Sequence, residues 1–333
     1  MGGADSAATG AGAWLLVIGM HRSGTSAMTG ALVGLGFGPP RPDDRMDWPE
    51  SNPEHWESFS LTVHDDAVLK RLGASWDAPP EPSTLTSDEF ERDLEGEGDP
   101  ASLLNASFDG PGPWVWKDPR TCLLLPYWKP RLSAPLAAVL VWREPQAVAT
   151  SLHRRDGMDL VVGVALWERY NRAALTGLDD VPTFITSYEE LLGDPGRAMT
   201  ELAEWCSSLP QFRQLSERWD VQAAVDTLAG PTATSDEEVP GLLLPEQVRL
   251  RSVLTSLRGT HDQFGHVDIG PESLWTSALL RSRREYRSRE LETMERTHDL
   301  ELSGAKLYAF NMEHSTSWRV TRPLRSILAA RKR

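Results

Sequence analysis

The stretch Trp14-Leu-Leu-Val-Ile-Gly19-Met-His-Arg22-Ser-Gly24-Thr25-Ser26 decides the fold of this chain. Residues 14–18 form an apolar run that is typical of a buried strand. A glycine-containing turn follows, and a helix is predicted to begin at Ser26. A strand, a loop and a helix in this order place backbone N–H groups and the positive end of a helix around a phosphate. The alternative interpretation is a tight strand-to-helix turn that binds no ligand.

The loop differs at one position from the phosphate loop of nucleotide-hydrolysing enzymes. That loop, G-x-x-x-x-G-K-[ST], uses its lysine on the β- and γ-phosphates and its Ser or Thr on magnesium. Here Thr25 takes the place of the lysine, and the fixed cation is Arg22, two residues before Gly24. A cation that comes earlier in the loop than this lysine and is followed by a Ser-Gly-Thr turn suits a 5′-phosphate and its leaving group. We expect no metal at this site.

A second motif follows another apolar, β-branched run at residues 137–142. Arg143 comes directly after this predicted strand, and Pro145 suits the first turn of a helix, where its missing N–H costs nothing. Ser151 then lies about two turns along that helix. The guanidinium of Arg143 offers a planar fork of donors that suits a phosphate. An arginine after a strand is a weak indicator by itself, but the two motifs in this order make a stronger signal.

Together the two motifs resemble those of the sulfotransferase family. Its members bind 3′-phosphoadenosine-5′-phosphosulfate with a strand, a [K/R]-S-G-T loop and a helix, and they place an arginine and a serine eight residues later on the 3′-phosphate. The resemblance covers residues 14 to about 205. It implies an α/β fold of the phosphate-loop type, with a parallel central sheet flanked by helices. It also implies that the nucleotide contacts His21, Arg22, Ser23, Gly24, Thr25, Ser26, Arg143 and Ser151.

Sulfuryl transfer needs a general base for the acceptor. Residues 52–57 resemble the N-P-x-x-[FYW]-E segment of related bacterial sulfotransferases, which implies that Glu57 is this base. His55 is the rival, because an imidazole has a pKa suited to proton transfer near neutrality, and Glu54 is third. A purely structural role for Glu57 is also open, since an acid at the start of the helix predicted over 58–72 favours the helix dipole.

Two cations are predicted to stabilise the transferred group and the leaving phosphate. Lys117 ends the strand predicted over 113–117, and open α/β sheets bind ligands at such strand ends. Glycan-modifying sulfotransferases have a lysine in a similar K-[SD]-P setting, so the resemblance implies that Lys117 stabilises the migrating group. The alternative is an ion pair with Asp118 or a neighbouring carboxylate. Arg22 and the loop N–H groups suit the leaving phosphate.

The rest of the chain alternates between strand and helix patterns, which favours a parallel sheet. A further strand is predicted at 183–187, and a long charged helix from about 272 to 300. We expect a sulfotransferase domain over 1–270 and a helical extension with a basic tail over 271–333. The two cysteines, Cys122 and Cys206, are predicted to be small buried residues in helices of a protein from a reducing compartment.

Charge and hydropathy restrict the partners and the location. The net charge of −14 argues against nucleic acid, which calls for a basic surface. We expect neither a membrane span nor a secretion signal, and hence a cytoplasmic enzyme. Residues 318–333 contain six basic residues and no acidic one. One interpretation of this tail is a weak contact to a membrane surface. The other, which we favour, is a tail without a membrane contact, either solvated or docked on the acidic body of the protein.

The tryptophans favour a sugar-like acceptor, although most tryptophans serve core packing. Flat indole faces suit a glycan or glycolipid, and five lie in segments expected near the acceptor: Trp48, Trp56, Trp76, Trp114 and Trp116.

Two other classes of protein stay open. One is a phosphate-loop kinase or another nucleotide-hydrolysing enzyme, and the other is a non-catalytic nucleotide- or glycan-binding protein of the same fold.

Overall fold

A five-stranded sheet organises the first of two units in this protein. The computed structural model describes residues 12–46, 55–82, 84, 100–110, 112–132, 134–229 and 239–314. Contacts divide the chain into Met1–Arg284 and Glu285–Arg333. The domain boundary expected at residue 270 stays a prediction. Trp48, Glu54 and the basic tail lie outside the described residues.

The sheet is mostly parallel and has the strand order β2-β1-β3-β4-β5. Strands β1 to β4 are parallel to their neighbours, and β5 runs antiparallel to β4. The strands are β1 (Trp14–Ile18), β2 (Trp114–Lys117), β3 (Leu136–Trp142), β4 (Thr183–Ser187) and β5 (Gly259–His261). The predicted α/β class with a parallel sheet flanked by helices is confirmed, and β5 is an additional strand that the sequence pattern did not indicate.

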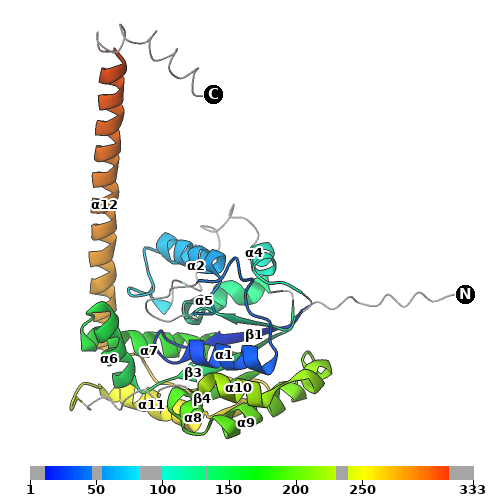
Figure 1. The fold of residues 1–333 in the computed structure, drawn as a ribbon. Helices are drawn as coiled ribbons and strands as arrows, with labels where there is room; N and C mark the ends of the chain where they lie inside the picture. The colour runs from blue at the N-terminus through cyan, green and yellow to red at the C-terminus, as the bar shows by residue number, and fades with distance from the viewer. Residues whose placement is uncertain are drawn as a thin grey trace, which may run out of the picture. The chain divides into compact units, whose positions relative to one another are not determined.

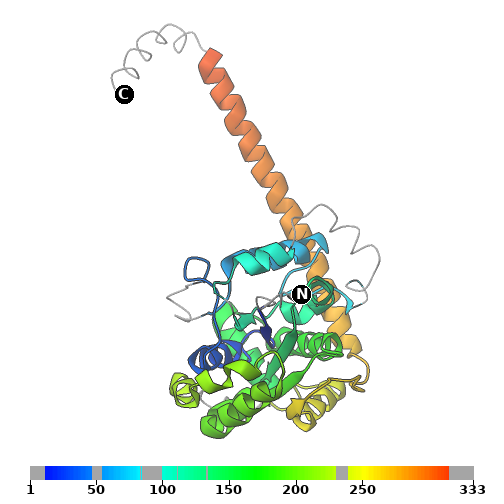
Figure 2. The same ribbon diagram turned by 90° about the vertical axis from the view of Figure 1, so that its right-hand side faces the viewer.

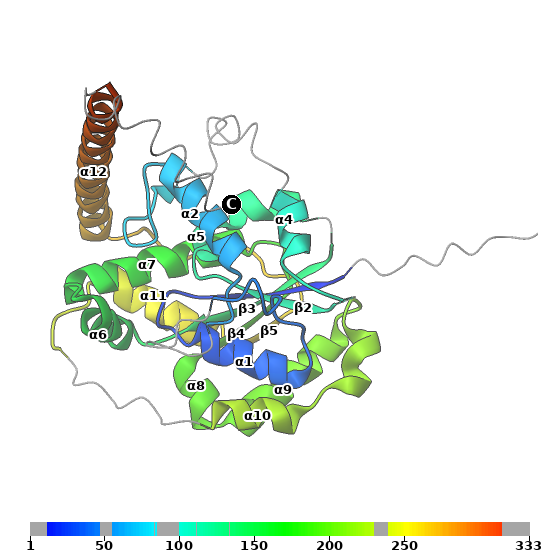
Figure 3. The same cartoon turned by 45° about the horizontal axis from the view of Figure 1, so that its top comes forward.

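Helices cover both faces of the sheet (Figures 1, 2 and 3). Successive side chains of a strand point to opposite faces. Trp14, Leu16 and Ile18 therefore join one core, and Leu15 and Val17 join the other. The first core includes residues of α2 (Phe59–Arg71), α4 (Pro100–Ala106), α5 (Thr121–Trp128), α6 (Pro145–Asp156), α7 (Leu160–Gly177) and α11 (Pro245–Ser256). The second includes residues of α1 (Thr25–Leu35), α8 (Tyr188–Gly193), α9 (Pro195–Ser208) and α10 (Val221–Leu228).

Local sequence signals set several helix ends near the carboxyl edge of the sheet. The Ser58 hydroxyl accepts a hydrogen bond from the N–H of Leu61 and caps α2. Pro145 occupies the first turn of α6, as predicted. Ser187 and Glu190 form a capping box at the start of α8.

The two cysteines are buried, Cys122 in α5 and Cys206 in α9, as expected. Short 3₁₀ turns cover Lys129–Arg131 and Arg213–Arg218.

Helix α12 (Leu274–His314) begins in the first unit and continues into the second. The predicted long charged helix is thus confirmed, and it extends beyond residue 300. In the part of the chain that the structure describes, no helix combines the length and the apolar character needed to cross a membrane.

Candidate functional site

The carboxyl ends of four neighbouring parallel strands bring the predicted site residues to one edge of the sheet. The loop 19–24 follows β1, Lys117 ends β2, and Arg143 follows β3. Tyr188 begins the helix after β4. Because β1 lies between β2 and β3, the loop has Lys117 on one side and Arg143 on the other. Ligands of open α/β sheets bind at this edge.

The loop after β1 requires glycine at two positions. A Cβ on Gly19 would lie 2.1 Å from the carbonyl oxygen of Val141, so the loop passes directly against β3. Gly24 has a φ of 90° and precedes α1, and a Cβ there would lie 2.1 Å from the ring of Tyr188. Arg22 also has a positive φ, of 69°. Such values are uncommon for residues other than glycine and concentrate at functional sites.

Arg22, Arg143 and Ser151 meet although they come from distant parts of the chain. The Arg22 Nε donates to Ser151 Oγ at 2.9 Å, and Arg143 Nη1 donates to the carbonyl oxygen of Arg22 at 3.3 Å. The guanidinium of Arg143 lies 4.9 Å from the ring centre of Tyr188. Burial lowers the pKa of Arg22, and the nearby Arg155 and Arg143 lower it further. The two predicted phosphate-binding motifs therefore form one cationic site.

His21 lies at the centre of this positive charge. Its ring packs 4.6 Å from the ring of Trp76 and 5.9 Å from the ring of Tyr170. Burial lowers the pKa of His21 well below its usual value, and four cations lower it further: Arg120, Arg155, Lys117 and Arg22. The imidazole is therefore neutral at neutral pH.

The free energy of unfolding is expected to fall as the pH drops below about 6.5, the ordinary pKa of an unfolded-state histidine. The folded-state pKa of His21 lies below that value, so the unfolded chain binds more protons in this window. The stabilisation is complete above about pH 6.5 and is lost as the pH falls toward the folded-state pKa, with a slope of at most about 1.4 kcal/mol per pH unit.

Urea-induced unfolding of the wild type and of His21→Gln, from about pH 8 to about pH 5, measures this slope. The variant should have a shallower slope. His55, whose pKa is also lowered, chiefly by burial, keeps a contribution of the same sign in both proteins. A variant with the full wild-type slope would show that His21 is not the group responsible.

Lys117 and Glu57, predicted separately, form one buried ion pair. The Lys117 Nζ donates to Glu57 Oε1 and, at 2.9 Å, to the carbonyl oxygen of His55. Between these two acceptors, Trp56 has a φ of 58°, and this left-handed turn lets both face the lysine. The side-chain cap of α2 is Ser58 and not Glu57, and the interaction of Glu57 with the helix dipole stays a prediction. The ion pair with a neighbouring carboxylate, which was the alternative role for Lys117, is therefore present with Glu57 as the partner. Asp118, the other partner considered, pairs with Arg120.

A second charged cluster supports the end of β2. Arg120 donates to Asp66 at 2.6 Å and to Asp118 at 3.1 Å. Burial alone would lower the pKa of Arg120, but the carboxylates of Asp118 and Asp66 outweigh it, so that the pKa is raised. Burial, reinforced by the charge of Asp118, raises the pKa of Asp65 well above its usual range. Sequence reasoning missed Asp65, which lies on the apolar side of α2, where the helical period points inward.

Cys122 contributes to the loop through its sulfur. Its Sγ accepts a hydrogen bond from the N–H of Gly19 at 3.1 Å. Burial raises the pKa of this thiol to about 12. A thiol with such a pKa stays protonated at neutral pH and is a poor nucleophile, so its role here is to support the loop.

Searches of protein-family models, curated proteins and solved structures find no match to this chain. A function is therefore inferred from the fold and from the geometry at the carboxyl edge of the sheet.

Proposed function

We propose that this protein transfers a sulfuryl group from 3′-phosphoadenosine-5′-phosphosulfate to a hydroxyl or amine, most suitably of a glycan or glycolipid. The observation that carries the proposal is the junction of the two anion-binding motifs. Arg22 donates to Ser151, and Arg143 donates to the backbone of Arg22. One ligand with two separate phosphate groups fits a site built from both motifs.

Polar atoms in the site suit such a ligand. Two of the buried side-chain atoms without a hydrogen-bond partner in the described part of the chain lie here, Ser23 Oγ and Arg143 Nε, and the Arg143 Nε is 3.9 Å from a carboxylate oxygen of Glu189. Buried polar atoms of native proteins are normally hydrogen-bonded, and phosphate oxygens would accept from both groups. The start of α1 adds backbone N–H groups beside Arg22. The donor, when bound, supplies an activated sulfuryl group and a phosphate leaving group.

Glu57 takes the proton in the proposed reaction. The acceptor oxygen or nitrogen forms a bond to sulfur, the bond from sulfur to the phosphate oxygen breaks, and adenosine 3′,5′-bisphosphate leaves with that electron pair. Lys117 holds the Glu57 carboxylate in place. Arg22 offsets the charge on the leaving phosphate. His55, which burial keeps neutral at neutral pH, is the alternative base.

Replacing Arg143 by alanine is expected to raise the dissociation constant for adenosine 3′,5′-bisphosphate by about 10–100-fold, since a charge-assisted phosphate contact contributes about 1.5–3 kcal/mol. Isothermal titration calorimetry in the presence of EDTA measures this affinity. Arg249→Ala is the matched control, because Arg249 lies on α11 and pairs only with Asp268 among its described ion pairs. Equal affinities of Arg143→Ala and the wild type would reject the proposed nucleotide site.

The same preparation separates the other two classes of protein. Binding of ATP that depends on magnesium, with no binding of adenosine 3′,5′-bisphosphate, would indicate a phosphate-loop kinase or nucleotide-hydrolysing enzyme. Nucleotide binding without transfer of radiolabelled sulfate to a broad panel of glycans, lipids and phenols would indicate a non-catalytic binding protein. Transfer to a member of the panel supports the proposal and identifies the acceptor class.

A further inference from the structure

Residues 76–80, here called the strap, are held largely through their backbone carbonyl groups, and the Asp77 carboxylate adds an ion pair with Arg283 at 2.7 Å. Pro79 and Pro80 have no N–H to donate, so their part of the strap can be anchored only by donors from elsewhere. Four side chains supply them: Tyr170 Oη to Trp76 O at 2.7 Å, Arg283 Nε to Asp77 O at 2.8 Å, Arg284 Nη1 to Pro79 O at 2.9 Å and Arg169 Nη1 to Pro80 O at 2.5 Å.

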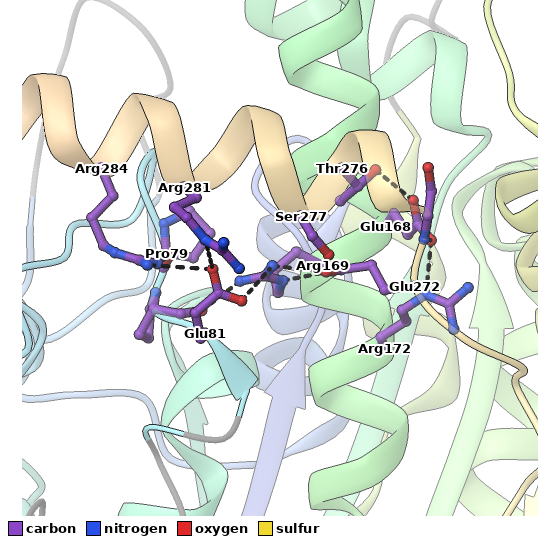
Figure 4. A network of polar contacts seen from close by, with 12 residues as sticks. Pro79, Glu81, Glu168, Arg169, Arg172, Glu272, Thr276, Ser277, Arg281 and Arg284 are labelled. Carbon is purple, nitrogen blue, oxygen red and sulfur yellow. Dashed lines mark hydrogen bonds and ion pairs between the residues drawn. The ribbon is translucent and has the colours of Figure 1, made fainter.

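The arginines that hold the strap are themselves fixed by carboxylates (Figure 4). Arg169, on α7, is 1% exposed and donates to both oxygens of Glu272, at 2.6 and 2.8 Å. Glu81, directly after the strap, accepts from Arg284 at 3.3 Å and from Arg281 at 3.4 Å. Bidentate and shared pairs of this kind are geometrically specific. The strap is therefore tied to α7 and to the first turns of α12.

The strap places one aromatic ring on the phosphate-binding loop. Trp76 packs against His21, with 4.6 Å between the ring centres. The guanidinium of Arg155, on α6, lies 5.4 Å from the Trp76 ring. Tyr170 contributes twice, because its hydroxyl holds the Trp76 carbonyl while its ring packs edge-on to His21. The position of the indole thus depends on residues more than 90 positions away in the sequence.

We propose that Tyr170, Arg283 and Arg284 are positioning residues that hold Trp76 against His21. Through the strap, the first turns of α12 thus fix an aromatic ring on the phosphate-binding loop. Two rings pack against His21, those of Trp76 and Tyr170, and four nearby cations act on its charge: Arg22, Lys117, Arg120 and Arg155. Trp76 excludes water from an imidazole that stays neutral among these charges. The inference rests on the proposed function only for the choice of nucleotide as ligand.

The test compares Arg283→Ala/Arg284→Ala with the wild type. The first readout is the pKa of His21 from its ring-proton resonance, assigned by its loss in His21→Gln. Release of the strap admits water, so this pKa should rise by about one unit toward its ordinary value. The second readout is the affinity for adenosine 3′,5′-bisphosphate, which should weaken about tenfold because the loop loses the packing of Trp76 against His21. Arg289→Ala, further along the same helix and exposed, is the matched control.

Trp76→Ala should reproduce both changes with the arginines intact, and Trp76→Phe should restore much of each. Unchanged His21 pKa and nucleotide affinity in a folded Arg283→Ala/Arg284→Ala protein would overturn the inference. If the double variant does not fold, Tyr170→Phe decides by the same criteria, since it removes one hydroxyl and keeps the ring. A shifted His21 pKa in a protein that binds no nucleotide would support the strap and reject the proposed function.

Discussion

Glu57→Gln is expected to lower the rate of sulfate transfer by about 10²–10⁴-fold, the usual contribution of a general base. The amide keeps the shape of the side chain but cannot accept the proton of the acceptor. Nucleotide affinity should change little, because Glu57 contacts Lys117 and lies outside the junction of Arg22, Arg143 and Ser151. Single-turnover transfer of radiolabelled sulfate and calorimetric titration of adenosine 3′,5′-bisphosphate measure the two quantities separately.

The variant also leaves the buried Lys117 without its carboxylate, so a loss of stability could be mistaken for a loss of catalysis. Glu57→Gln/Lys117→Met removes both charges and should regain most of the stability without regaining turnover. Glu201→Gln, on the exposed face of α9, is the control for the chemical change itself. Undiminished turnover in Glu57→Gln would transfer the role of base to His55.

Glu168→Ala is expected to lower the free energy of unfolding by about 3–5 kcal/mol, the cost of breaking a buried ion pair by removing one partner. Glu168 is fully buried on α7 and pairs with Arg172 at 2.9 Å. Its carboxylate also accepts from Ser273 N at 3.0 Å and Thr276 Oγ1 at 2.6 Å, at the start of α12, and from Gln247 at 3.1 Å. The substitution therefore leaves several buried donors unpaired.

Urea-induced unfolding measures this loss, and Glu201→Ala provides the comparison. Glu201 also pairs with arginines, Arg197 and Arg258, but its side chain is 41% exposed. Exposed pairs of this kind contribute about 0–1 kcal/mol. Similar losses in the two variants would show that burial of Glu168 does not determine its contribution.

Sequence patterns were sufficient to predict those elements whose formation depends on neighbouring residues in the chain. The strands at 14–18 and 183–187 were both predicted to the residue. Residues 14–18 are an unbroken apolar run, which is typical of a strand buried on both faces of a parallel sheet. Pro145 identified the start of α6 for the same local reason. Arg143 was expected at the carboxyl end of a strand and Ser151 about two turns along the helix that follows, and the structure brings both to the loop after β1.

The contacts that depend on long-range packing could not be predicted in this way. Glu57 and Lys117 are 60 positions apart, and only the fold shows that they pair with each other. The proline-rich segment at 76–80 resembles an ordinary surface loop in sequence, yet Tyr170 and three arginines from α7 and α12 hold it. β5 has three residues, too few for a period of two to be detected.

Both edge strands of the sheet disfavour the addition of a strand from another molecule. The outermost strands have only four residues in β2 and three in β5. Beside β2, Gly38 already uses amide groups that another chain would need: it donates to Pro113 O and accepts from Val115 N, each at 2.9 Å. Long, free strand margins are the templates on which proteins assemble into aggregates. We therefore expect little aggregation through strand addition at these two edges, even at high protein concentration.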